Sequence, residues 1–347
     1  MQLLPFIFRA RPAVPEMDFA GTVECTGSSV TDMPPGTPVF GSIPVGQHVR
    51  STSGALAGSI VVERDAVVRV PGTVALSEAA GVGIAGSTAL ACVTAAKVKR
   101  GDAVLVNGAA GGIGHLVLQM CLEKVGASGR VVGVCSGRNT SWVRELERGS
   151  STDNAVGSLR VIDREAEPLV PRLVRDYGAE RFDVVIDAAG IQEVYQSCPG
   201  FLKEGKPYVT VGPRLGRYTY AGMLGMLGTT AKNVLWPRIL GGTPRPYVQV
   251  AAAASLETLE ELAGMMERGA LRVHVGTLVD WEDVMKVSDF AWWVCTLLNL
   301  DRHTRSFLAD MLVVRLSLLL ANRILLRMRN ERVGSEYSSH RLVRIIS

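Results

Sequence analysis

A glycine-rich stretch after residue 107 contains the residue types best suited to chemistry. It consists of Ala109, Ala110, Gly111, Gly112, Ile113 and Gly114, between an apolar strand-like run and an amphipathic helical pattern. Glycines in such a turn let the backbone approach a pyrophosphate and let the helix pack on the sheet. The helix N-terminus also presents N–H groups and a positive dipole to phosphate oxygens. The stretch predicts a dinucleotide-binding loop, with Ala109 in place of the usual first glycine. A tight turn in a non-binding α/β domain is the alternative.

The next strand-like run ends in residues that suit a phosphate group: Ser136, Arg138 and Asn139. A site selective for NAD places an acid about 20 residues beyond the glycines, where it accepts hydrogen bonds from the ribose. No acid follows this run, and a hydroxyl with a guanidinium favours a 2′-phosphate instead. We therefore expect NADP(H) as the cofactor. If Arg138 is only a solvated loop residue, this preference loses its support.

Two later runs end in small residues that fit the same crevice. One ends at Ala189 and Gly190, and the other ends at Val211 and Gly212. Ligands of parallel α/β sheets lie beyond the carboxyl ends of the strands. We therefore expect these four residues beside the ribose and nicotinamide, although each glycine alone is equally typical of an ordinary turn.

The elements that must position these residues change in character along the chain. Residues 18–70 have the alternating pattern of β-strands, residues 76–97 are rich in alanine and helical, and strands alternate with helices from Ala103 onward. A helix at 256–268 and a strand at 273–279 follow. Alternating strands and helices indicate a parallel sheet. We therefore predict an α/β fold, with a doubly wound parallel sheet and a second, β-rich domain.

Composition and charge exclude some classes of function. The 347 residues carry a formal charge of +4, too small to indicate nucleic-acid binding, and 47% of them are hydrophobic, enough for a large core. The six cysteines form no CxxC pair, which favours reduced thiols inside the cell. No basic region precedes the first apolar run, so no signal peptide is expected. We expect a cytoplasmic protein, with a mitochondrial location as the alternative.

The C-terminal tail differs from the rest of the chain. From residue 301 onward it holds nine arginines and four acids, and its apolar run 306–326 is interrupted by Asp310, Arg315 and Arg323. Charges inside a membrane-spanning helix are costly. We expect an amphipathic tail that is the least ordered part of the chain, with membrane contact through this tail as the alternative.

Several motifs together resemble the medium-chain dehydrogenase/reductase superfamily. They are Asp18-Phe-Ala-Gly-Thr-Val, Pro38-Val-Phe-Gly, Glu78-Ala-Ala, Ser87-Thr-Ala-Leu, the glycine-rich loop and Val234-Leu-Trp-Pro-Arg-Ile-Leu-Gly-Gly-Thr-Pro-Arg. Within the superfamily the chain is similar to zinc-free quinone-oxidoreductase-like and enoyl-reductase-like members, especially fungal ones. The resemblance implies a partial GroES-like catalytic domain at residues 1–90 and a Rossmann domain at 91–235. A return to the catalytic domain at 236–288 and a divergent tail at 289–347 would follow.

The resemblance also implies a function. It predicts an NADPH-dependent oxidoreductase that transfers a hydride to a conjugated acceptor, such as a quinone, an enone or an enoyl thioester. Thr88 would lie near the nicotinamide, or would simply be a threonine in the interior of a helix. The expected partner is a small-molecule substrate, and many family members form homodimers.

No metal site is expected. Zinc-dependent relatives carry Gly-His-Glu where this chain has Met17-Asp18-Phe19, and the closely spaced cysteines of their structural zinc lobe have no counterpart. The five histidines are expected at the surface: His48, His115, His274, His303 and His340.

The sequence departs from the family pattern in three places. The Asp18 segment lies further along the chain in relatives, residues 147–159 look inserted, and no closing helix and strand are recognisable after residue 288. These departures fall mainly on the catalytic domain. A catalytically impaired NADP-binding protein and a membrane-associated protein anchored by its tail are therefore the alternatives to an active reductase.

Overall fold

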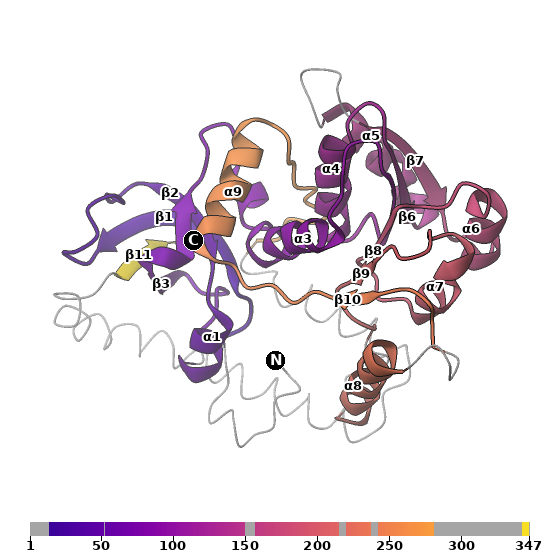
Figure 1. Ribbon diagram of the computed structural model, residues 1–347. Helices are drawn as coiled ribbons and strands as arrows, with labels where there is room; N and C mark the ends of the chain where they lie inside the picture. Colours follow the sequence, from indigo (N-terminus) through magenta and orange to yellow (C-terminus); the bar gives the residue numbers. More distant parts are fainter. Residues whose placement is uncertain are drawn as a thin grey trace.

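The computed structural model describes residues 14–51, 53–149, 157–214, 220–236, 242–280 and 342–346. Two β-sheets lie side by side, with helices α3 (Gly83–Ala96) and α9 (Leu256–Glu267) between them (Figure 1). Helix α9 packs against both α3 and a strand of the smaller sheet. The two sheets are therefore joined by packed helices, as well as by the chain that runs between them.

Six strands form one parallel sheet, in the order β10-β9-β8-β5-β6-β7. They are Ala103–Asn107 (β5), Arg130–Cys135 (β6), Ser158–Asp163 (β7), Val184–Asp187 (β8), Tyr208–Thr210 (β9) and Tyr247–Gln249 (β10). The chain starts at β5, adds β6 and β7 on one side, and then adds the other three strands on the opposite side. The strand order therefore reverses between β5 and β8, which is where such sheets bind ligands.

Helices cover both faces of this sheet because successive strand residues point to opposite sides. Val104 and Val106 pack with α3 and α4 (Gly114–Val125), whereas Leu105 packs with α6 (Leu169–Tyr177) and α7 (Gln192–Ser197). All three strand residues are fully buried. The predicted α/β fold with a doubly wound parallel sheet is confirmed.

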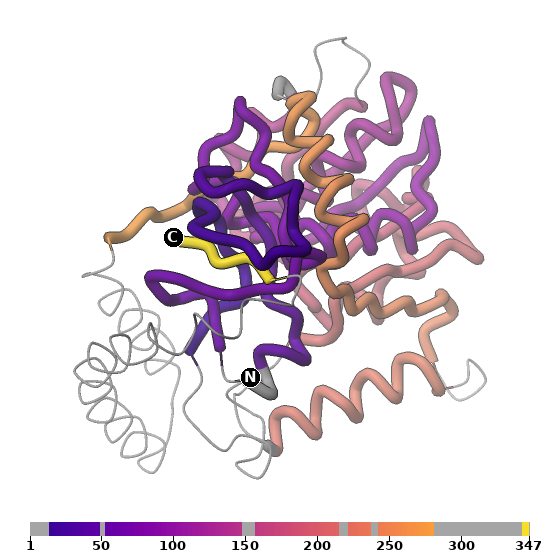
Figure 2. The backbone as a smooth tube through the Cα atoms, turned by 90° about the vertical axis from the view of Figure 1, so that its left-hand side faces the viewer, coloured from indigo at the N-terminus to yellow at the C-terminus, as the bar shows by residue number. Residues whose placement is uncertain are grey.

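The second sheet is antiparallel, with its strands in the order β3-β11-β1-β2-β4. They are Asp18–Thr26 (β1), Pro38–Ser42 (β2), Ser59–Glu63 (β3), Val67–Arg69 (β4) and Leu342–Ile346 (β11). Although β11 comes from the C-terminal end of the chain, it pairs with both β1 and β3 (Figure 2). Val343 and Ile345 belong to the core of this sheet and are almost completely buried.

The sequence-based expectation for the tail is wrong for residues 342–346. The sequence shows no recognisable closing strand after residue 288, but β11 fills a position inside the antiparallel sheet. Its buried residues alternate with more exposed ones, the ordinary pattern of a half-buried strand. The pattern was easy to miss because the strand is short and no family motif precedes it. The rest of the predicted tail, from 289 to 341, lies outside the described residues.

The remaining helices are α1 (Val45–Ser51), α2 (Leu76–Ala79), α5 (Thr140–Gly149) and α8 (Tyr220–Leu235), with 3-10 turns at Arg64–Ala66, Gly137–Asn139 and Cys198–Gly200. Two sequence-based boundaries need correction. Strand β10 pairs with β9, so the parallel sheet extends beyond the predicted boundary at residue 235. The strand expected at 273–279 is not present, because residues 271–280 have no regular secondary structure.

Among the helices within the described ranges, none is both long and apolar enough to cross a membrane. The apolar run 306–326, on which the membrane-anchored alternative depends, lies outside those ranges.

The buried strand β11 gives a stability prediction. We expect Ile345→Ala to lower the free energy of unfolding by about 2–5 kcal/mol, because it leaves a cavity in the core of the antiparallel sheet. Ile346 is a matched control, since it is the next residue of β11 and is 45% exposed. Ile346→Ala should change the free energy by less than about 0.5 kcal/mol. Denaturant unfolding measures both values, and equal effects would show that β11 does not pack in this way.

Candidate functional site

The glycine-rich loop begins with a left-handed turn at Gly108, directly after β5. Gly108 has a φ of +80°, a conformation that glycine adopts without steric cost. A Cβ atom at Gly114 would lie 2.0 Å from the carbonyl oxygen of Gly108, so only glycine lets the helix start this close to the turn. Ala109 is fully buried and does not have a positive φ. The usual glycine spacing places this turn at Ala109, but Gly108 makes it.

The loop leaves backbone donors available for an anion. Gly111 donates its N–H to the carbonyl of Gly108 at 2.9 Å. Further N–H groups of the loop have no acceptor among the described residues, including those of Ala110, Gly112 and Ile113. Both Gly111 and Gly112 are exposed. Unpaired donors at the start of a helix are what phosphate oxygens require, so these residues fit the pyrophosphate of a dinucleotide.

His115 supports this loop from behind. Its Nδ1 lies 2.8 Å from the carbonyl oxygen of Gly111, and its Nε2 lies 3.3 Å from the backbone nitrogen of His274. Since a backbone N–H only donates, Nε2 accepts, and the ring is neutral with its hydrogen on Nδ1. Burial lowers the pKa of His115, the hydrogen bond to Gly111 opposes that shift, and the charge of His274 adds to it.

The expectation that the histidines lie at the surface is wrong for two of them. His115 and His48 are each only 4% exposed, and His48 is held by a hydrogen bond to the carbonyl of Ser53. His274 is exposed as expected, and its ring stacks on Trp142 of α5 with 3.9 Å between ring centroids. His303 and His340 lie outside the described residues.

The turn after β6 is held by the same tryptophan. Trp142 Nε1 donates to Oδ1 of Asn139 at 3.3 Å, and Nδ2 of Asn139 donates to Oγ of Ser136 at 3.0 Å. Ser136 Oγ acts as an acceptor in the second bond, so its own hydrogen can be donated elsewhere. The side chain of Arg138 is exposed. The three predicted residues thus lie on one short turn, where Ser136 and Arg138 can donate to an anion.

Two acids from the neighbouring strand reach this turn. Oε2 of Glu165 accepts from the N–H of Gly137 at 3.2 Å, and Oδ2 of Asp163 would lie 2.6 Å from a Cβ atom at Gly137. The residues that follow β6 in the sequence include no acid. Asp163 is the last residue of β7 and Glu165 follows that strand, and the pairing of β6 with β7 brings both acids close to this turn. The expectation that no acid lies near this turn, which supported NADP(H), is therefore wrong.

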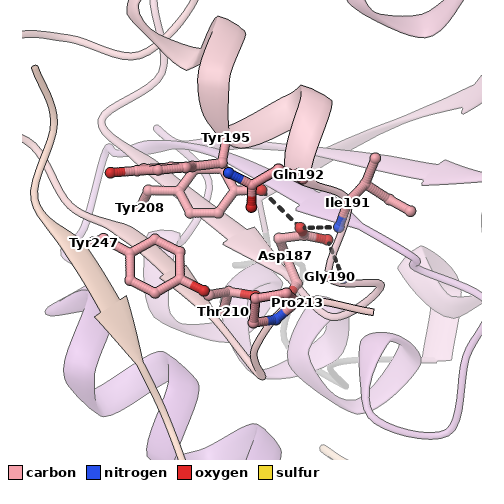
Figure 3. A pocket seen from close by; sticks show the side chains of 9 residues that line it. All are labelled: Asp187, Gly190, Ile191, Gln192, Tyr195, Tyr208, Thr210, Pro213 and Tyr247. Atoms are coloured by element: carbon pink, nitrogen blue, oxygen red, sulfur yellow. Dashed lines mark hydrogen bonds between the residues drawn. The ribbon is translucent and has the colours of Figure 1, made fainter. Parts of the chain in front are cut away.

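Asp187, at the end of β8, organises the loop that follows it (Figure 3). Its carboxylate accepts five hydrogen bonds of 2.7–3.0 Å, from the backbone nitrogens of Ala189, Gly190 and Ile191, from Nδ2 of Asn107 and from the hydroxyl of Tyr208. Burial raises the pKa of Asp187, and these hydrogen bonds act in the opposite direction. The carboxylate therefore connects β5, β8 and β9 at the point where the strand order reverses. Sequence reasoning missed it, because an aspartate inside an apolar strand gave no distinctive signal.

The loops after β8 and β9 touch each other. Gly190 and Gly212 both have positive φ, +67° and +106°, and a Cβ atom at Gly190 would lie 2.2 Å from the carbonyl oxygen of Gly212. A Cβ atom at Gly108 would in turn lie 3.1 Å from that of Ala189, so the glycine-rich loop adjoins the loop after β8. The structure thus brings together four of the predicted cofactor residues: Ala189, Gly190, half-buried Val211 and Gly212.

A hollow of about 730 Å³ opens beside these loops. Its walls are the segments 190–192 and 213–214, together with one side of α8 that includes Gly222, Gly225 and Met226. Two side-chain hydrogen bonds between Gln192 and Asn233, of 2.8 and 2.9 Å, attach α8 to this place. The recess around Asp187 in Figure 3 is filled by its own side chains and leaves no room even for water. The larger hollow therefore offers the space for a small molecule.

Thr88 lies on α3, which packs against β8 and β9. Its hydroxyl donates to the carbonyl of Ile84 at 2.7 Å, a bond typical of a threonine inside a helix, so its place near a nicotinamide stays a prediction.

Asp18 accepts the N–H of Ile84 with both oxygens, at 3.0 and 2.9 Å, and so caps α3. Within the described ranges, no three His, Cys, Asp or Glu side chains converge closely enough to hold a metal ion.

Comparisons with known proteins agree with this architecture. Residues 156–287 match a family model described as zinc-binding dehydrogenase. A trans-enoyl reductase of Penicillium oxalicum is 29% identical over 306 residues, covering 81% of this chain and 76% of the relative. A medium chain reductase of an Acremonium species is 30% identical over 307 residues, covering 82% and 80%. A quinone oxidoreductase from Coxiella burnetii has a similar fold, with a TM-score of 0.58 and 21% identity over 80% of this chain and 76% of its own.

The buried ring of His115 predicts that acid destabilises the protein. Because its pKa is lowered in the folded state, the unfolded chain takes up the proton first, and stability is lost as the pH falls through about 6.5. His115→Gln removes this titration, so its melting temperature should fall less than that of the wild type between about pH 7.5 and 5.5. His274→Gln keeps the backbone N–H that His115 accepts and removes only the smallest cause of the lowered pKa of His115, so it should follow the wild type more closely than His115→Gln does. If His115→Gln shows the wild-type pH dependence, the ring is not buried and neutral as described.

Proposed function

The chain belongs to the medium-chain dehydrogenase/reductase superfamily and is an oxidoreductase, and from this we propose that it transfers a hydride from NADPH to a small conjugated acceptor. We infer a quinone, an enone or an enoyl thioester as the acceptor. Both fungal relatives are named as reductases, and one is named as a trans-enoyl reductase. The nicotinamide supplies the hydride when bound, and the protein supplies orientation and electrostatics.

The glycine-rich loop is the observation that carries this proposal. It lies at the reversal of strand order, beside the loops that follow β8 and β9. Its N–H groups without an acceptor among the described residues include those of Ala110, Gly112 and Ile113. Donors at this place support a pyrophosphate there, with Gly190 and Gly212 beside the nicotinamide half. The hollow next to Gly190 then gives the acceptor a place near the nicotinamide.

The choice of NADPH over NADH rests on the turn after β6. The hydroxyl of Ser136 is oriented by Asn139 so that it can donate, and the guanidinium of Arg138 is exposed next to it. Hydrogen bonds between charged partners are roughly twice as strong as neutral ones, so a 2′-phosphate gains more here than a hydroxyl. The acids Asp163 and Glu165 reduce this advantage, which Ser136 and Arg138 must therefore outweigh.

We further propose that the reaction proceeds without zinc. Asp18, which stands where zinc-dependent relatives carry histidine, directs its carboxylate at the start of α3. Negative charge that develops on the acceptor would then be stabilised by hydroxyl groups, backbone N–H groups or solvent. Asp187 contributes by fixing the loop 189–191 through three backbone bonds, because a loop held in this way keeps the reactants aligned.

Two glycines of the loop should respond differently to substitution. Gly111 is exposed, and a Cβ atom there meets only the carbonyl oxygen of Gly108, at 3.3 Å. Gly111→Val should therefore fold but lose NADPH binding, because its side chain takes up space that the pyrophosphate needs. Gly114→Ala should instead lower the melting temperature by several degrees, because its Cβ atom meets backbone at 2.0 Å. Thermal melts and NADPH titrations distinguish the two, and full NADPH affinity in Gly111→Val would refute the assigned loop.

The exposed guanidinium of Arg138 should decide the cofactor preference. Removing a charged hydrogen bond to phosphate costs about 1.5–3 kcal/mol, so Arg138→Ala should weaken NADPH binding roughly ten- to hundredfold. NADH lacks the phosphate, and its affinity should change less than about threefold. Fluorescence titration of both cofactors against both proteins measures this. Equal affinities of the wild type for NADPH and NADH would contradict the proposed preference.

The proposed reaction is tested by following NADPH oxidation in the presence of quinones, enones and enoyl thioesters. We expect turnover with at least one of these classes and none in the Gly111→Val variant. Cofactor binding without turnover on any of them would identify the protein as a catalytically impaired NADP-binding protein instead.

A further inference from the structure

We propose that Glu165 competes with the 2′-phosphate for the turn after β6 and so limits the preference of this protein for NADPH over NADH. This inference rests on the proposed function, because it concerns the cofactor of that same site.

The geometry places Glu165 where the phosphate should bind. Its Oε2 accepts from the N–H of Gly137 at 3.2 Å. Gly137 lies between Ser136 and Arg138, the two residues proposed to hold the phosphate, and it begins the 3-10 turn Gly137–Asn139. A backbone donor at the start of this turn suits an anion, and the carboxylate already uses it.

The backbone around Glu165 is held by hydrogen bonds, whereas its side chain reaches solvent. The N–H of Glu165 donates to Oδ1 of Asp163 at 2.8 Å, and the N–H of Arg164 donates to the carbonyl of Cys135 at 2.9 Å. The first bond is local to the end of β7, and the second holds that end against the end of β6. Glu165 itself is exposed. Its carboxylate can therefore leave Gly137 for solvent when a stronger anion arrives, without disturbing the loop.

The two cofactors meet this carboxylate differently. A 2′-phosphate needs the same donor and is repelled by the carboxylate charge, so NADPH must displace Glu165 before it can bind fully. NADH presents an uncharged ribose hydroxyl there, which is not repelled by the carboxylate and leaves the N–H of Gly137 to Glu165. Glu165 therefore weakens NADPH binding and leaves NADH binding unchanged.

Charges of both signs lie around the end of β6. Burial raises the pKa of the Cys135 thiol, Asp163 and Glu165 raise it further, and Arg144 and Arg164 lower it. Without the charge of Glu165 one of these anions is lost, and a phosphate at this turn gains from that.

The test is a calorimetric titration of NADPH and NADH against the wild type and Glu165→Gln. Glu165→Gln keeps an oxygen that can accept from Gly137 but removes the charge that competes with the phosphate, so NADPH should bind roughly three- to tenfold more tightly, with NADH unchanged within about twofold. The gain should shrink in high salt, since the contact is exposed. Glu204→Gln is the matched control, because it removes one negative charge from an exposed residue on a different turn, between Leu202 and Gly205. It should leave both affinities unchanged.

The outcomes separate this inference from the function on which it rests. If the wild type binds NADPH and Glu165→Gln binds it no more tightly, the competition does not exist. If NADH binding weakens in Glu165→Gln, the carboxylate binds the ribose hydroxyls and the inference is wrong. If the wild type prefers NADH but Glu165→Gln moves toward NADPH, the competition holds and the proposed NADPH preference fails. If neither cofactor binds the wild type, both fail.

Discussion

The carboxylate of Asp187 is buried inside the parallel sheet, and the geometry of the site depends on the five hydrogen bonds that it accepts. A buried charge is tolerated only when it is fully paired, and each buried donor left without a partner costs about 1–3 kcal/mol. Asn107 ends β5, and Tyr208 begins β9. By bonding to both, Asp187 fixes the spacing of the strands at the reversal of strand order. By bonding to the next loop as well, it presents Gly190 to Gly212.

A second network connects the two ends of the proposed cofactor site. His115 holds the carbonyl of Gly111 on one side and accepts the backbone N–H of His274 on the other. The ring of His274 stacks on Trp142, which bonds to Asn139, which in turn bonds to Ser136. Through these contacts the turn that would bind the adenosine ribose is braced against the loop that would bind the pyrophosphate. The protein's own contacts therefore fix much of the shape of the site.

The sequence predicted most of the parallel sheet, because strong apolar runs and a glycine-rich turn are local signals. It also identified the residues of four loops that the structure brings to one edge of that sheet. What it missed depends on contacts between segments distant in the sequence. Glu165 meets Gly137 only because β6 pairs with β7, and β11 joins the antiparallel sheet only by pairing with β1 and β3. Gly108 was overlooked for a different reason, since the usual glycine spacing placed the left-handed turn one residue too late.

We propose that this protein moves a hydride from a bound nicotinamide directly to a conjugated acceptor. The most direct measurement uses two preparations of NADPH, each carrying deuterium on one face of C4, with mass spectrometry of an enone or enoyl thioester after reaction. Direct transfer in a site as rigidly braced as this one predicts one deuterium on the acceptor carbon from one preparation and none from the other. An acceptor that is reduced without deuterium from either preparation, or that is not reduced at all while NADPH stays bound, would contradict the account.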